Sequence, residues 1–241
     1  MHEFLTSPAL WVSVSLLVYA GAKALYARAA TPLVHPVLVT IAIIIALLVA
    51  LDIDYATYNE GGRIISFFLG PSVVALGVPL AERIRELRAQ APALIVTTIA
   101  GALVGIVSAV APLLVAGAPE SMITSMAPKS VTTPIAMSIV EREGGEPSLA
   151  AAFVVMTGVL GAVIGPMLLR TIGVTTPVAR GYALGAASHG VGTARALEDG
   201  RIEGAAGSLA ICLNGIATSV LTPPVLGLVY SSWDVASRLS L

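Results

Sequence analysis

The chain has 241 residues, of which 56% are hydrophobic and only 11% are charged, and its mean hydropathy is +0.92. Soluble domains are about 45–50% apolar and about 25% charged, so this composition excludes an ordinary soluble domain and favours a polytopic membrane protein. The net charge of −1 offers no basic patch, and we expect no nucleic-acid partner. The single cysteine, Cys212, cannot form an internal disulfide, and its apolar surroundings predict a small core residue.

Five apolar runs approach the length of about 20 residues that a helix needs to cross a bilayer. The chain begins MHEF, with an acid and no basic residue, so we expect no secretory signal. Lys23 and Arg28 follow the first run, which predicts an N-terminus outside the cell. The five runs are residues 8–22 (extended by Leu25 and Tyr26), 36–51, 93–117, 149–169 and 209–230.

Three further segments are apolar but interrupted by Gly and Pro: residues 62–80, 121–140 and 181–196. The charged connectors between all these segments are short. We therefore expect an all-α polytopic membrane protein with one transmembrane domain (1–241) and seven to eight spans.

A shift of about 115 residues aligns plain runs with plain runs and the interrupted segment at 69 with that at 184. This order predicts two structural repeats, about 8–117 and 121–230, which we expect to be inverted. Interrupted segments at matching positions of two repeats are typical of the binding site of a secondary transporter. We expect such a carrier to work by an elevator or rocking movement.

The segment APKSVTTPIAM, residues 127–137, places Lys129 between two prolines in an apolar stretch. Each proline removes a backbone donor and breaks the helix, and free backbone groups in a membrane are tolerated only inside protein or beside water. Ser130, Thr132 and Thr133 add hydroxyls, and a helix restarting near Pro134 adds amide donors. These groups together predict an anion site. The alternative is a lysine that snorkels to the membrane edge.

The segment GAASHGVGTARALE, residues 185–198, predicts an unwound or closely packed backbone, because it has three glycines within eight positions. Ser188, His189, Gly190 and Thr193 are its candidate binding residues, and His189 has the titration range for proton coupling. Close helix packing explains the glycines equally well. In the segment 69–79 only Ser72 is polar, and Asn214, in the last long run, either faces the site or bonds a neighbouring helix. Arg195 and Glu198 are spaced to pair across one helix turn.

The motifs of the main enzyme classes do not occur. The sequence contains no phosphate-binding Gly-x-x-x-x-Gly-Lys-Ser/Thr loop, no His/Cys/Glu group with metal-ligand spacing and no nucleophile–base constellation. We expect no enzyme and no cofactor, but coupling of transport to H⁺ or Na⁺ is open.

Four stretches resemble the LrgB/CidB family of bacterial membrane proteins, which is antiholin-like and related to plastidal glycolate/glycerate translocators. They are PKSVTTPIAM, EREGGEPSLAAAFVVMTGVLGAVIGP, RGYALGAASHGVGTARALE and LGPSVVALGVPLAERI. The resemblance covers about residues 8–230. After Val-Pro-Leu this chain has Ala-Glu-Arg, where many members have an aromatic and a basic residue, a departure that affects only a connector.

The resemblance implies a multi-pass protein of the bacterial inner (plasma) membrane and two competing functions. One is a secondary transporter of small monocarboxylates of the glycolate, glycerate, lactate or pyruvate type. Lys129 and its neighbouring hydroxyls would then hold the carboxylate, and Ser188, His189 and Thr193 the rest of the substrate or a coupled proton. The alternative is an antiholin-like regulator of murein hydrolase export and cell lysis, acting with a small holin-like membrane protein. The residues favour transport, because a pore regulator needs no cation among broken helices. We also expect a homodimer.

Overall fold

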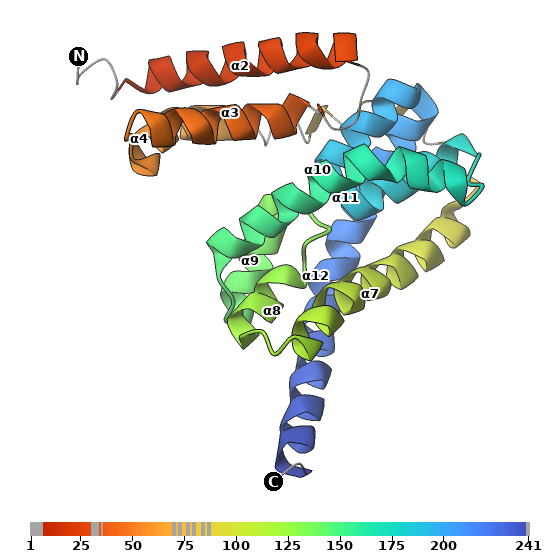
Figure 1. Cartoon of the computed structure of the whole chain (residues 1–241). Coiled ribbons are helices and arrows are strands. Elements are labelled where there is room, and N and C mark those ends of the chain that lie inside the picture. Colours follow the sequence, from red (N-terminus) through yellow and green to blue (C-terminus); the bar gives the residue numbers. More distant parts are fainter. Residues whose placement is uncertain are drawn as a thin grey trace. The chain divides into compact units, whose positions relative to one another are not determined.

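The computed structural model describes residues 7–29, 34, 36–68, 71, 74–75, 78, 81–82, 85 and 88–239, with side chains as far as residue 232. The regular elements of this part of the chain are helices (Figure 1). The chain divides into two compact units, residues 1–76 and 77–241. Nearly all the candidate site residues lie in the second unit.

In its described residues, the first unit has the helices α2 (Pro8–Ala29), α3 (Pro36–Ala50) and α4 (Tyr55–Phe67). Trp11 of α2 is 2% exposed and packs edge-to-face on Tyr58 of α4, with ring centroids 5.7 Å apart. The Tyr58 hydroxyl also lies 3.2 Å from the Ser15 hydroxyl. A Cβ at Gly61 would lie 2.7 Å from the Trp11 Cβ, so this glycine lets α4 approach α2 closely.

The described residues of the second unit include three long helices and three short or broken ones. The long helices are α7 (Ala91–Val115), α10 (Pro147–Thr171) and α12 (Arg201–Leu239), and the others are α8 (Glu120–Met126), α9 (Thr133–Glu143) and α11 (Pro177–Asp199). A proline stands in the first turn of α7, α9, α10 and α11, where its missing N–H has no helical partner to lose. Gly144, with φ of 81°, ends α9 in the left-handed conformation that favours glycine.

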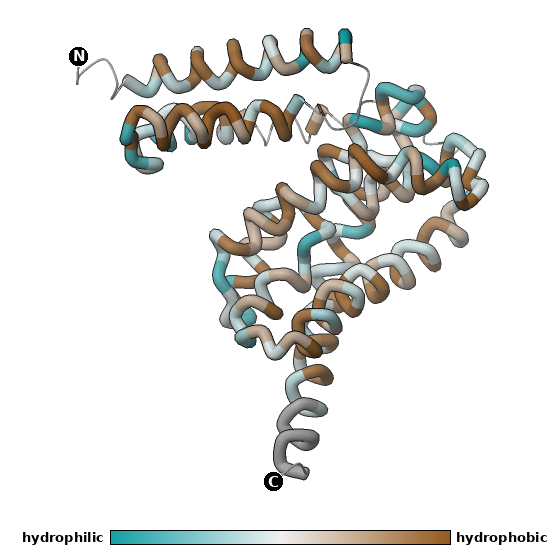
Figure 2. The backbone as a smooth tube through the Cα atoms, viewed as in Figure 1, coloured by the Kyte–Doolittle hydropathy of each residue, from teal (hydrophilic) through white to brown (hydrophobic). Residues whose placement is uncertain are grey.

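All five predicted apolar runs are helices, and the protein is a helical membrane protein. Within the described residues, α2, α7, α10 and residues 201–232 of α12 are long and apolar enough to cross a membrane, and α3 is shorter. Figure 2 shows hydrophobic residues along much of α7 and α10, and large side chains such as Val104 and Leu160 are exposed on them, as expected of surfaces in contact with lipid. The prediction that Cys212 is a core residue is wrong: Cys212 is exposed on α12.

Two interrupted segments double back, so neither of them crosses the membrane as a single span. The total of seven to eight spans stays a prediction, because residues 69–87 are described only in part. The first consists of α8, residues 127–132 and α9, and we call it the first hairpin (Figure 1). The Glu146 N–H, beyond α9, donates to Ser125 Oγ in α8 at 2.7 Å. In a continuous helix these residues would be about 30 Å apart. The segment therefore enters and returns on the same side, with residues 127–132 as its tip.

The second interrupted segment, α11, also doubles back, and we call it the second hairpin. Its backbone leaves the helical conformation at Ser188 (φ −134°, ψ 19°) and His189 (φ 43°, ψ −131°). Arg180 Nη2 near the start of α11 lies 2.7 Å from Asp199 Oδ2 at its end. A straight helix would separate these residues by about 28 Å. The halves 177–187 and 190–199 are therefore antiparallel, and Ser188 and His189 form the tip.

The third interrupted segment, residues 62–80, is described only in part, at residues 62–68, 71, 74–75 and 78. Its first part belongs to α4. The plain helices on either side of it, α3 and α7, correspond in order to α10 and α12 around α11. The two repeats and their orientation stay a prediction.

Candidate functional site

Asn214 of α12 connects the tips of the two hairpins. Its side-chain Nδ2 donates to the Ser130 carbonyl at 3.3 Å and to the Ala186 carbonyl at 3.0 Å. Its Oδ1 accepts a hydrogen bond from Thr218 Oγ1 at 3.4 Å. Asn214 is 3% exposed, so its amide holds two broken segments together inside the protein. Of the two roles predicted for Asn214, bonding to neighbouring elements is the one that these contacts describe.

Lys129 lies at the tip of the first hairpin and is partly buried. Its ammonium Nζ is 3.4 Å from the carbonyl oxygen of Gly105, near the middle of the membrane-length helix α7. Among the described residues, Lys129 forms no ion pair. A lysine that snorkels would contact the end of such a helix and not its middle. The tip therefore carries a positive charge, well inside the unit, that no carboxylate of the described chain neutralises.

Three hydroxyls surround the tip and the start of α9. Ser130, Thr132 and Thr133 are partly buried. Thr132 is the N-cap residue of α9 but makes no side-chain capping bond. Because the first amides of a helix lack intrahelical partners and carry partial positive charge, the hydroxyls, these amides and Lys129 form one set of donors. Such a set suits an anion.

The tip of the second hairpin is strained, and both of its residues, Ser188 and His189, are buried. His189 has a positive φ of 43°, which is costly for any residue except glycine. Its ring is 7% exposed, and Nε2 lies 3.0 Å from the Val154 carbonyl of α10, so the Nε2–H tautomer donates to it. The histidine is thus held by α10, and its role as a proton carrier stays a prediction.

Two hydroxyls of the second hairpin are buried without a hydrogen-bond partner in the described chain. They belong to Ser188, which is 1% exposed, and Thr193, which is 0% exposed. A buried hydroxyl without a partner is rare and calls for a specific explanation. A Cβ at Gly190 would meet nothing within 4 Å, so the backbone at the tip has open space beside it.

Glycines of α10 create the space for this tip, and sequence reasoning did not single them out. A Cβ at Gly158 would lie 2.6 Å from His189 Cε1, and one at Gly161 would overlap Ser188 Oγ. Their spacing of three residues places both on one face of α10, a signal that was readable in GVLG. Within the hairpin, a Cβ at Gly192 would collide with Leu184 O and lie 2.6 Å from Ser188 Cβ. The prediction of a closely packed backbone here is therefore confirmed at Gly192.

Ion pairs close the base of the second hairpin. Arg195 Nη1 lies 3.3 Å from Glu198 Oε2, as the spacing predicted, and 2.7 Å from Asp199 Oδ1. Asp199 also contacts Arg180 of the other half. Asp199 thereby joins both halves, while the tip points away from these charges.

The structure thus brings Ser130 and the Ser188 region together through Asn214, with Lys129 beside Ser130. Ser72 lies outside the described residues. Among the described residues, no group of three His, Cys, Asp or Glu side chains is arranged to hold a metal ion. The chemistry available at the tips is that of an ammonium, hydroxyls, helix amides and one imidazole, which can bind an anion and exchange a proton.

These features define the class as a polytopic helical membrane protein, in which two helical hairpins meet at Asn214. A model of the LrgB-like family matches residues 15–228. The chain belongs to this family, and the resemblance noted in the sequence is confirmed. No solved structure matches the chain.

Similar proteins extend over nearly the whole chain. The uncharacterised protein YwbG of Bacillus subtilis (strain 168) is 37% identical over 215 residues, or 88% of this chain and 95% of that protein. The holin-like protein CidB of Staphylococcus epidermidis (strain ATCC 12228 / FDA PCI 1200) is 31% identical over 231 residues, or 95% of this chain and 100% of that protein. The antiholin-like protein LrgB of Bacillus mycoides (strain KBAB4) is 30% identical over 218 residues, or 90% of this chain and 95% of that protein.

Proposed function

We propose that this protein carries small monocarboxylates across the membrane, and that the hairpin tips hold the carboxylate. The observation that carries the proposal is Lys129, which is partly buried at a broken tip and has no carboxylate partner among the described residues. A cation in this setting is costly unless an anion accompanies it. A substrate carboxylate would supply that anion and would accept hydrogen bonds from the neighbouring hydroxyls and α9 amides.

Alternating access follows from the same arrangement. Each hairpin is anchored at its base, and the two tips meet at Asn214. Movement of one hairpin relative to α12 would expose the site to one side of the membrane and then to the other. The substrates that fit the donor set are short acids with a 2-hydroxy or 2-keto group, because Ser188 and Thr193 offer buried hydroxyls without partners.

The test is flux in liposomes that contain the purified protein. Labelled glycolate, lactate and pyruvate are each supplied to wild type, Lys129→Ala and Lys129→Arg. Removing a charge-assisted hydrogen bond costs about 1.5–3 kcal/mol, which weakens binding about 10- to 150-fold. We expect Lys129→Ala to lose transport at low substrate concentration and Lys129→Arg to retain part of it.

Lys23 provides a matched control, because the sequence contains only these two lysines and Lys23 is exposed on α2. Lys23→Ala should transport as wild type does. Equal flux in Lys129→Ala and wild type would remove the site assignment, and absence of flux for every acid in the wild type would remove the proposed function.

A second candidate has its own support, because two of the relatives are named holin-like and antiholin-like. These names favour the alternative, in which the protein regulates murein hydrolase export and lysis together with a small holin-like membrane protein. It predicts a stable complex with that partner, no flux of its own, and lysis phenotypes unchanged by Lys129→Ala. Co-purification with the partner, together with the flux assay, separates the two candidates.

A further inference from the structure

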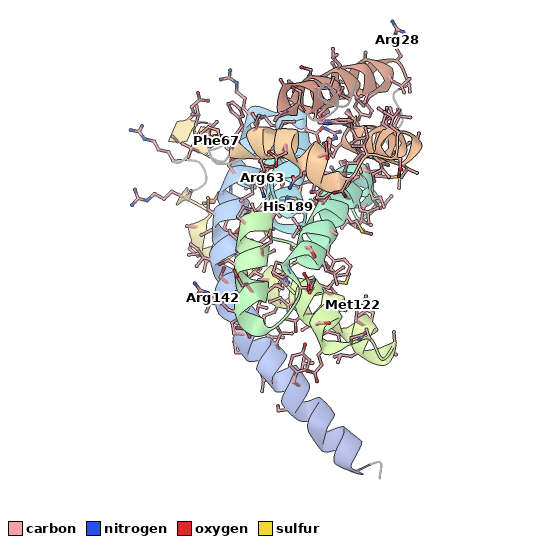
Figure 3. The ribbon with its side chains drawn as sticks, turned by 90° about the vertical axis from the view of Figure 1, so that its left-hand side faces the viewer. Arg28, Arg63, Phe67, Met122, Arg142 and His189 are labelled. Carbon is pink, nitrogen blue, oxygen red and sulfur yellow. The ribbon has the colours of Figure 1, made fainter. Side chains whose placement is uncertain are left out.

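A cavity of about 470 Å³ lies between α9 of the first hairpin and α12. Its residues include Pro134, Ile135, Ser138 and Arg142 on α9, and Ser219 and Pro223 on α12. Volumes of about 300–1,000 Å³ are usual for small-molecule sites. Figure 3 shows α9 beside α12, with Arg142 projecting outward from the ribbon. The cavity thus runs from an arginine near the base of the hairpin toward the start of α9.

The inner end of this cavity stops close to the hairpin tips. Pro134 is in the first turn of α9, directly after Thr132 and Thr133. A Cβ at Gly215 would lie 3.1 Å from Ile135 Cδ1, so α9 and α12 touch here. The neighbouring Asn214 binds the Ser130 carbonyl. Ile135, which lines the cavity, thus contacts α12 next to Asn214, the residue that binds the tip.

We propose that this cavity is an outer binding site for the carboxylate, through which the anion reaches the hairpin tips; this rests on the proposed function. Arg142 attracts the anion at the mouth, and the hydroxyls of Ser138 and Ser219 replace its hydration along the walls. Among the described residues, Arg142 makes no ion pair, so its guanidinium is free to bind a carboxylate bidentately. The Ile135–Gly215 contact is the inner gate.

Glu143 also borders the cavity, and it tests the proposal because its charge is opposite to that of Arg142, so the two variants should change KM in opposite directions. Its carboxylate repels the same anion that Arg142 attracts. Charges at a binding mouth act mainly on the association rate. Arg142→Gln should therefore raise KM for lactate about tenfold with kcat unchanged, and Glu143→Gln should lower KM. Shifts of KM in the same direction for both variants, or none in either, would overturn the role of Arg142.

A second experiment measures whether water and lactate reach the cavity, and it does not require transport. In a Cys212→Ser background, single variants Ser138→Cys and Ser219→Cys are treated with a sulfonate-bearing methanethiosulfonate, which reacts only with thiols that water reaches and ionises. Met137→Cys is the matched control. Met137 is an exposed neighbour on α9 that does not line the cavity, so its side chain should face lipid, where a thiol does not ionise. We expect fast labelling at the two serine positions, slowed by lactate, and slow labelling at 137.

The outcomes are separable from those of the flux assay. Labelling at 138 and 219 no faster than at 137 would overturn the water-filled cavity even if the protein transports lactate. Fast labelling that lactate does not slow would overturn the binding site. Fast, lactate-protected labelling in a protein without flux would retain the outer site and reject the transport proposal.

Discussion

The packing of the second hairpin against α10 makes a sharp prediction at Gly161. The Cβ of Gly161→Ala would overlap Ser188 Oγ and lie 2.7 Å from Ser188 Cβ. Ser188 is 1% exposed, so its side chain cannot turn away from α10 without displacing its neighbours. Overpacking of this kind costs about 1–3 kcal/mol, which for a chain of this size lowers the apparent Tm by about 2–12 °C.

The measurement is thermal unfolding of purified protein in detergent. Gly101→Ala on α7 is the control, because a Cβ there meets nothing within 4 Å, and it should be at least as stable as wild type, since alanine favours a helix more than glycine does. Adding Ser188→Gly to Gly161→Ala should restore most of the lost stability, since both clashing atoms are then removed. If Gly161→Ala is as stable as Gly101→Ala, Ser188 does not face α10 and the hairpin geometry is refuted.

Three further predictions test the tips and the hairpins. Asn214→Leu removes the donor of two partly buried carbonyls, so it should lower the unfolding free energy by about 1–3 kcal/mol; a smaller change than this would show that Asn214 does not hold the tips. His189→Gly should be about 1 kcal/mol more stable than His189→Ala in the same unfolding assay, because glycine tolerates the positive φ; equal stability would argue against that backbone conformation. The third prediction uses single cysteines at positions 116, 148 and 175 in Cys212→Ser protein. Those at 116 and 148 should label from the same side of the membrane, because the first hairpin returns, and that at 175 from the other side, because α10 crosses. Labelling of 116 and 148 from opposite sides would contradict the first hairpin.

The sequence predicted where the helices break because the breaks have local causes. Pro128 and Pro134 each remove a backbone donor, and the polar residues between them mark backbone that must find other partners. The glycines around Ser188 and His189 carried the same information. The positions of both tips were therefore readable from residue types alone.

The doubling back of the chain at these breaks was not readable. An interrupted apolar segment has the same hydropathy whether it crosses the membrane or returns, because hydropathy reports transfer into lipid and not direction. The distinguishing contacts, Ser125 with Glu146 and Arg180 with Asp199, join residues about twenty positions apart. Cys212 was misplaced for a related reason: apolar residues of a membrane helix face lipid as readily as the protein interior.

The tips also explain why the protein keeps groups that weaken its own fold. The unpaired ammonium of Lys129 and the unpartnered hydroxyls of Ser188 and Thr193 each lose hydration without gaining a full set of bonds. A buried unsatisfied group costs about 1–3 kcal/mol, and an apolar residue of similar size avoids that cost. A protein that acted only through its outer surface would gain stability from such replacements. A protein that binds an anion at the tips instead recovers the deficit when the ligand arrives, since binding to the folded state alone adds about 2.7 kcal/mol at a ligand concentration of 100 Kd. On the proposed function, the weakness of the empty site and its affinity for an anion would have the same cause.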